Sequence, residues 1–222
     1  LAGGPATGRC LVNVTPDGER TMCTFLGAAV ELTPADVSPE AIAQAEILYL
    51  EGYLFDPPEA RAAFAKGAAV ARAAGRTIAL SLSDAFVVER HRAELLAFID
   101  AEVDVLFANE AEVTALFQTD FAEALGRLRG RVRIAAVTRG AQGSVVLAGD
   151  AEQQIACERA AQLVDTTGAG DQYAAGFLSG LAAGRPLADC GRLGSIAAAE
   201  VVSHFGPRPQ VRLKDLVAAR GL

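Results

Sequence analysis

The segment with the clearest chemical potential is a run of small residues that ends in a carboxylate. The run is Asp165-Thr166-Thr167-Gly168-Ala169-Gly170-Asp171, and a helix-like stretch follows it. Glycines let backbone N–H groups approach an anion closely, and the free N–H groups at a helix start carry partial positive charge. A carboxylate beside a bound phosphate would repel it, so Asp171 is suited to take a proton from a hydroxyl that attacks the phosphate. The run therefore indicates a site for phosphoryl transfer.

The same residues also fit an ordinary helix start. Asp165 or Thr167 can cap the helix with a side-chain oxygen. Asp171 in the first turn would then only interact favourably with the helix dipole. Other motifs must decide between these two readings.

Two further motifs follow predicted strands. One is Asn-x-x-Glu at Asn109 to Glu112, and the other is Thr-x-Gly-x-x-Gly at Thr138 to Gly143. The first also suits a capping box, and the second also suits a β-turn. Ligands of open α/β sheets bind at the carboxyl ends of the strands. We therefore expect both motifs to meet Gly168 at one edge of the sheet.

The elements that must position these motifs alternate along the chain. Short apolar runs alternate with longer Ala-rich amphipathic stretches, which is typical of βα units on a parallel sheet. A hairpin with a Pro16-Asp17-Gly18 turn precedes them. The pattern predicts strands at 9–15, 19–25, 47–50, 77–82, 104–108, 133–137, 144–147 and 153–156, the last two as a small antiparallel pair, and helices at 58–74, 89–99, 110–117, 121–128, 170–183 and 187–203.

Composition limits the function classes. With 222 residues, 51% of them hydrophobic, the chain can bury one substantial core. A net charge of -7 without a run of Lys or Arg argues against a nucleic-acid partner. No apolar run reaches the roughly 18 to 20 residues of a membrane span. Four cysteines without Cys-x-x-Cys spacing indicate neither zinc nor a disulfide framework, and we expect reduced thiols in a cytoplasmic protein.

The three motifs, in this order, resemble the PfkB or ribokinase-like family of carbohydrate and nucleoside kinases. The resemblance runs from about Leu1 to about Pro209. It implies a three-layer α/β/α fold with a mostly parallel sheet and a small β lid, in a single kinase domain over residues 1–222. Residues 9–26 would be a remnant of the lid. The chain starts at Leu1 rather than Met and lacks the family's N-terminal acceptor-binding elements, so we expect the N-terminal part to be missing.

The resemblance also assigns the catalytic groups. Asp171 would be the base and would contact the acceptor hydroxyl. The N–H groups of Ala169, Gly170 and Asp171 would form an anion hole after Gly168. Because one general base typically contributes about 10²- to 10⁴-fold in rate, Asp171 is the residue on which the prediction depends most.

ATP and Mg²⁺ are the cofactors that the resemblance implies. Asn109 and Glu112 would organise hydrated Mg²⁺, which keeps several waters when few protein carboxylates bind it. Some family members also bind a monovalent cation near the loop at 165–167 and the turn at 203–206. A histidine near a helix end is also commonly a favourable cap to the helix dipole, which is the alternative for His204. The residues expected at the nucleotide are Asn109, Thr138, Gly140, Gly143, Thr167, Ser195 and His204.

The acceptor is harder to predict. Stretches such as 17–21, 103–110 and 195–198 resemble adenosine kinases more than ribokinases or fructokinases. Tyr53, Leu54 and Phe86 could stack a base, although such residues at strand ends are more often core. We expect a small nucleoside or sugar substrate, no nucleic-acid or membrane partner, and a monomer or homodimer; a sugar kinase, an inactive nucleotide-binding homologue and an inert fragment are the alternatives. His91 is expected to be solvated.

Overall fold

The computed structural model describes residues 4–222, which group into two compact units. The first unit consists of 24–137 with the residues up to Cys10 and with Leu147–Ala151. The second consists of Leu11–Cys23, Thr138–Val146 and Glu152–Leu222. The start of the family resemblance at Leu1 lies outside the described residues. The interpretation as a single kinase domain stays a prediction.

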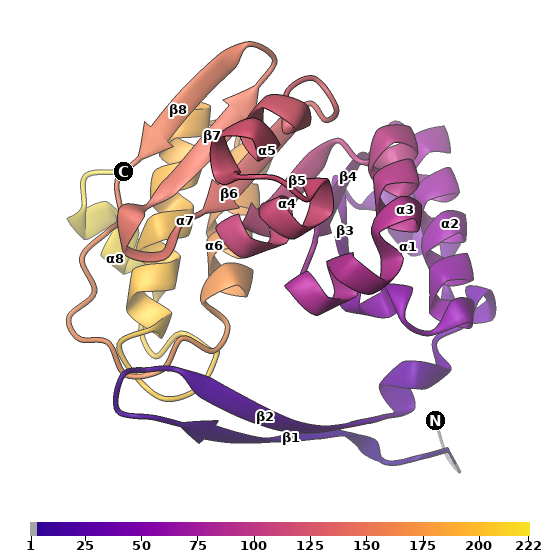
Figure 1. Ribbon diagram of the computed structural model, residues 1–222, viewed down its shortest axis with the longest axis horizontal. Helices are drawn as coiled ribbons and strands as arrows, with labels where there is room; N and C mark the ends of the chain where they lie inside the picture. Colours follow the sequence, from indigo (N-terminus) through magenta and orange to yellow (C-terminus); the bar gives the residue numbers. More distant parts are fainter. Residues whose placement is uncertain (1–3) are drawn as a thin grey trace. The chain divides into compact units, whose positions relative to one another are not determined.

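Four strands form the core of the first unit (Figure 1). In parallel pairs, the leucines Leu50, Leu80 and Leu106 face one another across three neighbouring strands and are buried. Branched apolar residues are favoured in such strands because they pack well on a pleated sheet that is covered on both faces. The four strands are neighbours in the order β3 (Ile47–Glu51), β4 (Thr77–Ser81), β5 (Val105–Asn109) and β6 (Ile134–Thr138).

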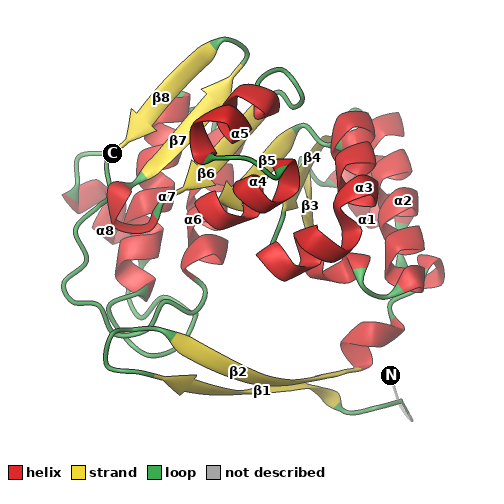
Figure 2. Cartoon of the chain, in the orientation of Figure 1, coloured by secondary structure: helices red, strands yellow, loops and turns green. Residues whose placement is uncertain are grey.

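The helices of the first unit cover these strands (Figure 2). Most of them begin directly after a residue whose side chain caps the helix. Asp84, for example, accepts a hydrogen bond from the N–H of Phe86, so the helix predicted to start at 89 begins four residues earlier. The short helix at 39–44 was not predicted. The helices are α1 (Pro39–Gln44), α2 (Pro58–Ala73), α3 (Ala85–Glu102), α4 (Glu110–Phe117) and α5 (Phe121–Leu128), and 3₁₀ turns lie at Ala28–Glu31, Pro34–Asp36 and Gly52–Phe55.

His91 lies at a kink in α3, where its backbone is not helical. The expectation that this histidine is solvated was wrong. Its side chain is only 16% exposed, and Nε2 lies 2.7 Å from Oδ1 of Asp56. Phe55 packs against the ring. Sequence periodicity could not show this, because Asp56 lies 35 positions away along the chain.

Two long helices dominate the second unit. Glycines allow them to approach closely: a Cβ at Gly176 would lie 2.5 Å from the carbonyl oxygen of Leu193, and one at Gly194 would lie 2.7 Å from that of Tyr173. Phe177 and Ile196 are buried in the same helix pair. The elements are the first residues of β7 (Ser144–Ala148), all but the first residue of β8 (Ala151–Ile155), α6 (Ala169–Ala182), α7 (Leu187–Val201) and the unpredicted α8 (Leu213–Ala219), which packs on α7.

The predicted hairpin forms a separate two-stranded sheet. Its strands are β1 (Thr7–Val14) and β2 (Arg20–Gly27), and nearly all of their residues are exposed. Gly18 has φ +82° in the connecting turn, a conformation that favours glycine. An α/β fold with a mostly parallel sheet and a small β hairpin is thus confirmed. No helix within residues 4–222 is long and apolar enough to cross a membrane.

Candidate phosphoryl-transfer site

The turn before α6 has a backbone that only glycine tolerates. Gly168 is the N-cap residue of α6 and has φ +79°. A Cβ at this position would lie 2.6 Å from the Cβ of Pro207. The residue at this position must therefore be glycine for two reasons: the backbone is left-handed, and Pro207 leaves no room for a side chain. The turn presents the start of the helix to solvent without a covering side chain at Gly168.

Asp165 holds the turn together from inside. Its Oδ1 accepts hydrogen bonds from the N–H (2.9 Å) and hydroxyl (2.6 Å) of Thr167, and its Oδ2 accepts one from the N–H of Gly206 (3.0 Å). Burial alone would raise the pKa of this carboxyl, but these bonds and the nearby positive charge of Arg20 hold the pKa below its usual range. Asp165 is therefore a structural carboxylate. Thr167 was predicted to bind the nucleotide, but its hydroxyl donates a hydrogen bond to Asp165.

The N–H groups and the carboxylate at the start of α6 are available for a ligand. The N–H of Ala169 donates to the carbonyl of Thr166 at 3.2 Å. The N–H groups of Gly170 and Asp171 have no acceptor within residues 4–222. Within the same range the exposed carboxylate of Asp171 makes no hydrogen bond or ion pair. An anion can thus be bound by two N–H groups, beside a carboxylate that is free to take a proton.

The tip of the hairpin contacts this turn, which the sequence motifs did not predict. The carbonyl of Gly18 accepts hydrogen bonds from the N–H (3.2 Å) and hydroxyl (3.1 Å) of Thr166. Nη1 of Arg20 donates to the same hydroxyl at 2.8 Å. A guanidinium is therefore held at the residue two positions before Gly168. The only sequence signal was an arginine shortly after a Pro-Asp-Gly turn.

We call residues 165–168 and the first turn of α6 the anion turn. The predicted nucleotide loop lies in the same unit as the anion turn. Gly140 and Gly143 have φ +54° and +83°, and a Cβ at Gly143 would lie 2.0 Å from the carbonyl oxygen of Ile155. Just after the loop, the buried hydroxyls of Ser144 and Tyr173 share a hydrogen bond of 2.7 Å, and burial raises the pKa of Tyr173 to about 12. This bond connects the loop that starts at Thr138 to helix α6. The nucleotide-binding role of the loop stays a prediction.

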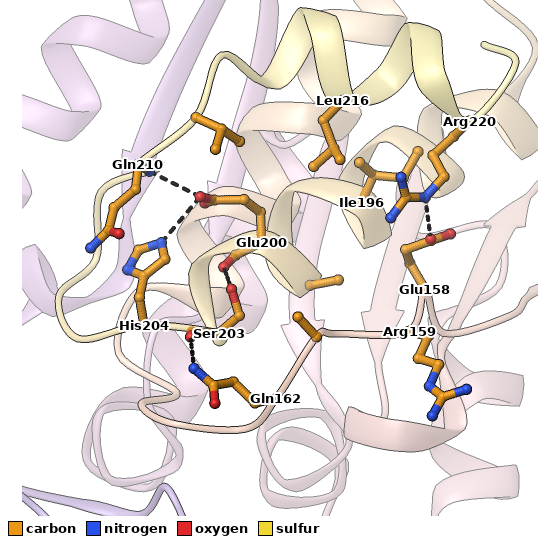
Figure 3. A pocket seen from close by; sticks show the side chains of 13 residues that line it. Glu158, Arg159, Gln162, Ile196, Glu200, Ser203, His204, Gln210, Leu216 and Arg220 are labelled. Carbon is orange, nitrogen blue, oxygen red and sulfur yellow. Dashed lines mark hydrogen bonds and ion pairs between the residues drawn. The ribbon is translucent and has the colours of Figure 1, made fainter.

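Two cavities border α7, and each has one of the predicted nucleotide residues in its wall. His204 lines a cavity of about 390 Å³, together with Ile196, Leu216 and Arg159 (Figure 3). Ser195 lines a second cavity of about 230 Å³. Its hydroxyl accepts a hydrogen bond from the N–H of Glu158 at 2.7 Å, so it also has a structural partner.

In the first unit, Asn109 and Glu112 form a reciprocal capping box at the start of α4. Oδ1 of Asn109 accepts from the N–H of Glu112, whose carboxylate accepts from the N–H (2.9 Å) and Nδ2 (2.7 Å) of Asn109. Burial raises the pKa of Glu112 to about 7; the N–H of Asn109 opposes the rise, while the charges of Asp84 and Glu51 add to it. The capping alternative is therefore present in the structure. A capping box is compatible with the predicted role of the two residues in binding hydrated Mg²⁺, because that role also uses their side-chain oxygens.

The donor set nevertheless suits a hydrated cation. Two further carboxylates, those of Asp84 and Glu51, act electrostatically on Glu112. Over residues 4–222, however, no three His, Cys, Asp or Glu side chains are arranged to hold a metal ion directly. Mg²⁺ that keeps its waters fits such a region better than a fully coordinated ion. Magnesium binding through water thus stays a prediction.

The residues proposed for the acceptor lie in the first unit. Tyr53 and Phe86 are 54% and 69% exposed, so the expectation that they are core residues does not hold. Leu54 is half-buried. Nearby along β3, Glu51 accepts a hydrogen bond from the hydroxyl of Ser83, which has an unusual φ of +68°. Whether these residues and Asn109 meet the anion turn, which belongs to the other unit, stays a prediction.

Comparison with known proteins places these features in one family. The profile of the pfkB family carbohydrate kinases matches residues 3–212. An uncharacterized sugar kinase of Archaeoglobus fulgidus is 36% identical over 105 residues, which is 47% of this chain and 42% of that protein. The chain thus spans less than half of this curated relative.

Two solved structures are similar over more of the chain. The adenosine kinase from Sinorhizobium meliloti is 48% identical, with a TM-score of 0.95 over 100% of this chain and 68% of that one. A probable sugar kinase protein from Rhizobium etli is 45% identical, with a TM-score of 0.94 over 96% of this chain and 66% of that one. With the three motifs and the anion turn, these similarities show that the chain belongs to the pfkB family of carbohydrate kinases.

Proposed function

We propose that this chain carries the phosphoryl-transfer site of an ATP-dependent kinase that acts on a hydroxyl of adenosine or a related nucleoside. The observation that carries the proposal is the start of α6. A glycine turn leaves two N–H groups without an acceptor among the described residues, and they lie beside an exposed carboxylate, Asp171, that makes no hydrogen bond or ion pair with those residues. A carboxylate that only stabilised the helix dipole would not need an anion-binding turn next to it.

The reaction requires charge neutralisation and proton transfer at one place. The N–H groups of Gly170 and Asp171 would bind an oxygen of the transferred γ-phosphoryl group, with Ala169 beside them. The carboxylate of Asp171 would accept the proton of the attacking hydroxyl as the new P–O bond forms and the bond to ADP breaks. Arg20, which the hairpin holds at Thr166, would add positive charge as the transition state develops.

The nucleotide would be bound by backbone and by apolar surface. Thr138, Gly140 and Gly143 would lie along its phosphates and ribose. The cavities beside α7, which His204 and Ser195 line, would hold the base. Mg²⁺ supplies charge neutralisation at the phosphates when bound; of this chain's residues, Asn109 and Glu112 would bind its water shell.

A nucleoside acceptor is favoured by exposed aromatic surface. Tyr53 and Phe86 offer rings to solvent, as stacking on a base requires. The 48% identical structure is described as an adenosine kinase, which supports the same choice. A sugar acceptor is the second candidate, because the structure that is 45% identical is described as a probable sugar kinase. An inactive homologue is disfavoured because Asp171 is present and has no partner within the part of the chain that the structure describes.

The test compares Asp171→Asn with a matched variant. Both would be made in the full-length gene product, with ADP release measured from Mg-ATP in the presence of adenosine, ribose or fructose. Asp171→Asn should keep ADP binding and the melting temperature but lose about 10²- to 10⁴-fold in turnover. Asp189→Asn makes the same change in the first turn of α7 and should leave turnover unaffected.

Three outcomes separate the possibilities. Turnover with adenosine that disappears in Asp171→Asn supports the proposal. Turnover only with a sugar keeps the role of Asp171 and replaces the acceptor. An Asp171→Asn variant that retains most of its activity would refute the assignment of the base.

A further inference from the structure

Glu200 is a buried carboxylate that no sequence motif singled out. It lies in the last turns of α7, and its side chain is 7% exposed. Its Oε2 is buried and has no hydrogen-bond partner in residues 4–222. Leaving a polar atom in this state is unfavourable, because the atom loses its hydrogen bonds to water and gains none in return. The bonds that the other oxygen, Oε1, makes must therefore justify a carboxylate at this buried position.

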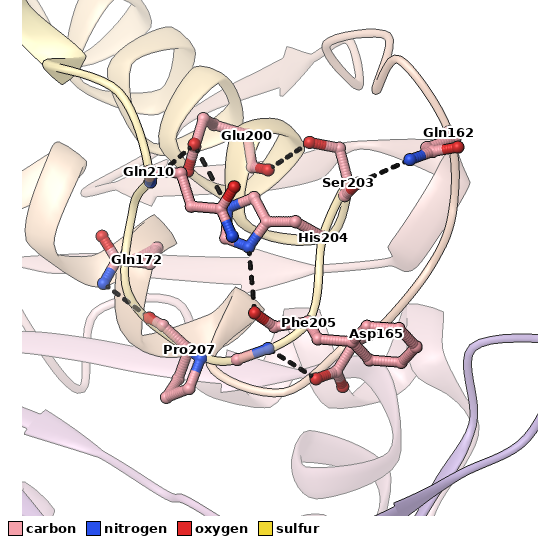
Figure 4. A network of polar contacts seen from close by, with 10 residues as sticks. Gln162, Asp165, Gln172, Glu200, Ser203, His204, Phe205, Pro207 and Gln210 are labelled. Atoms are coloured by element: carbon pink, nitrogen blue, oxygen red, sulfur yellow. Dashed lines mark hydrogen bonds and ion pairs between the residues drawn. The ribbon is translucent and has the colours of Figure 1, made fainter.

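Oε1 connects the two ends of one loop (Figure 4). It lies 3.2 Å from Nε2 of His204 and accepts a hydrogen bond from the N–H of Gln210 at 2.9 Å. These two residues begin and end the loop 204–210. Outside this loop, Ser203 donates from its hydroxyl to the carbonyl of Glu200 at 2.6 Å. A single carboxylate oxygen thus closes the loop onto the end of α7.

The middle of the same loop contacts the anion turn at three points. The N–H of Gly206 donates to Asp165, and Nε2 of Gln172 donates to the carbonyl of Pro207 at 3.2 Å. The ring of Pro207 also lies directly against Gly168, where a Cβ would clash. Asp165 and Gly168 belong to the turn that precedes α6, and Gln172 lies in the first helical turn of α6. Movement of the loop would therefore move the free N–H groups of the turn.

We infer that Glu200 is a positioning residue, which holds the loop 204–210 and through it the N–H groups that bind the transferred phosphoryl group. The inference rests on the proposed function for its catalytic consequence. A displacement of about 1 Å at a catalytic group can cost about 10²-fold in rate. Glu200 touches neither of the two N–H groups, so its effect must pass through the loop.

The test uses Glu200→Ala and Glu200→Gln in the full-length protein. Alanine removes the acceptor, whereas glutamine keeps a carbonyl oxygen for His204 and Gln210. We expect Glu200→Ala to lower kcat by about 10- to 100-fold, a larger factor than the rise in the KM for MgATP that follows from its place in the wall of the His204 cavity. Glu200→Gln should restore most of kcat. Cys190→Ala, a buried change in the same helix away from the loop, is the control for lost stability.

A second readout does not depend on turnover. Hydrogen exchange of the Thr167 and Gly206 amides, which both donate to Asp165, should be about tenfold faster in Glu200→Ala than in the wild type or in Cys190→Ala. In a His204→Ala background, Glu200→Ala should cost less than it does alone, because the two residues act in one network.

The failures of the inference and of the proposed function are distinguishable. An active wild type whose Glu200→Ala variant keeps kcat, or loses it no more than Cys190→Ala does, overturns the inference and leaves the function standing. Unchanged amide exchange at the turn overturns it as well. A wild type that is inactive with every acceptor refutes the proposed function, while faster exchange in Glu200→Ala still supports the coupling between loop and turn.

Discussion

Glu112 should make the stability of the protein fall as the pH rises from 5 to 8. Its side chain is 4% exposed, and its pKa in the folded state is about 7, compared with 4.5 when it is not perturbed. Between these two values the folded state binds more protons than the unfolded state. By linkage, the free energy of unfolding then decreases as the pH rises through this window and levels off above about pH 7.

The size of the effect follows from the two pKa values. The full difference corresponds to about 3 kcal/mol, of which about 2 to 3 kcal/mol falls between pH 5 and pH 8. For a chain of this length, that is a decrease in melting temperature of about 5 to 10 °C. Other ionisable groups contribute to the same pH profile, so a variant is needed to isolate Glu112.

Glu112→Gln provides this comparison. The amide cannot accept both hydrogen bonds from Asn109, which should cost about 1 kcal/mol at every pH. The two proteins are expected to have similar stability near pH 5, and the variant should be more stable by about 2 kcal/mol near pH 8. Glu110→Gln, in the same first turn of α4, serves as the control and should follow the wild type. Urea unfolding in magnesium-free buffer measures all three.

Parallel pH profiles for the wild type and Glu112→Gln would refute this reasoning. They would mean that Glu112 ionises in the folded state at its usual pKa, so that burial and the neighbouring carboxylates do not dominate. A profile that changes in the opposite direction would contradict the sign of the linkage itself.

Two further predictions concern the second unit. Gly176→Ala should destabilise the protein by about 1–3 kcal/mol, because the new methyl group would meet the carbonyl of Leu193 in the neighbouring helix. Thermal unfolding measures this loss. An unchanged melting temperature would show that the two helices can separate freely. Arg20→Ala should lower kcat by about 10- to 10³-fold while the stability of the protein stays nearly unchanged. The control Arg9→Ala, also on the hairpin, should change neither kcat nor stability. Equal kinetics for the two variants would remove Arg20 from the mechanism.

Most of the regular elements could be predicted from local pattern. The strands at 47–51 and 105–109 and the helices at 110–117 and 121–128 agree closely with their predicted limits, because apolar periodicity and capping residues are local signals. The helices at 39–44 and 213–219 were missed, since both are short and bury no residue completely. Their stability comes from tertiary contacts that periodicity does not record.

The site shows the same division. The helix start at Gly168 and the position of Asp171 in its first turn could be predicted because both lie within one short run of residues, whereas the catalytic role of Asp171 stays a proposal. Arg20 and Glu200 could not, because their partners are Thr166, 146 positions away, and the backbone of a loop that has no periodic pattern. The contact of His91 with Asp56 could not be predicted for the same reason, because the two residues are 35 positions apart. Pairings of this kind depend on how the chain returns to itself, which a single sequence does not reveal.

The close approach of α6 and α7 has a consequence for how the protein is made. Gly176 and Gly180 in one helix, and Gly191 and Gly194 in the other, each lower helix propensity by about 1 kcal/mol relative to alanine. Neither helix is therefore expected to persist before the other is available to pack against it. On the ribosome, the turn at Gly168 should remain unstructured until synthesis has passed Val201 and α7 has left the exit tunnel. Until then, the emerging chain should lack the turn that we propose to bind phosphate, although every strand within residues 4–222 has already been made.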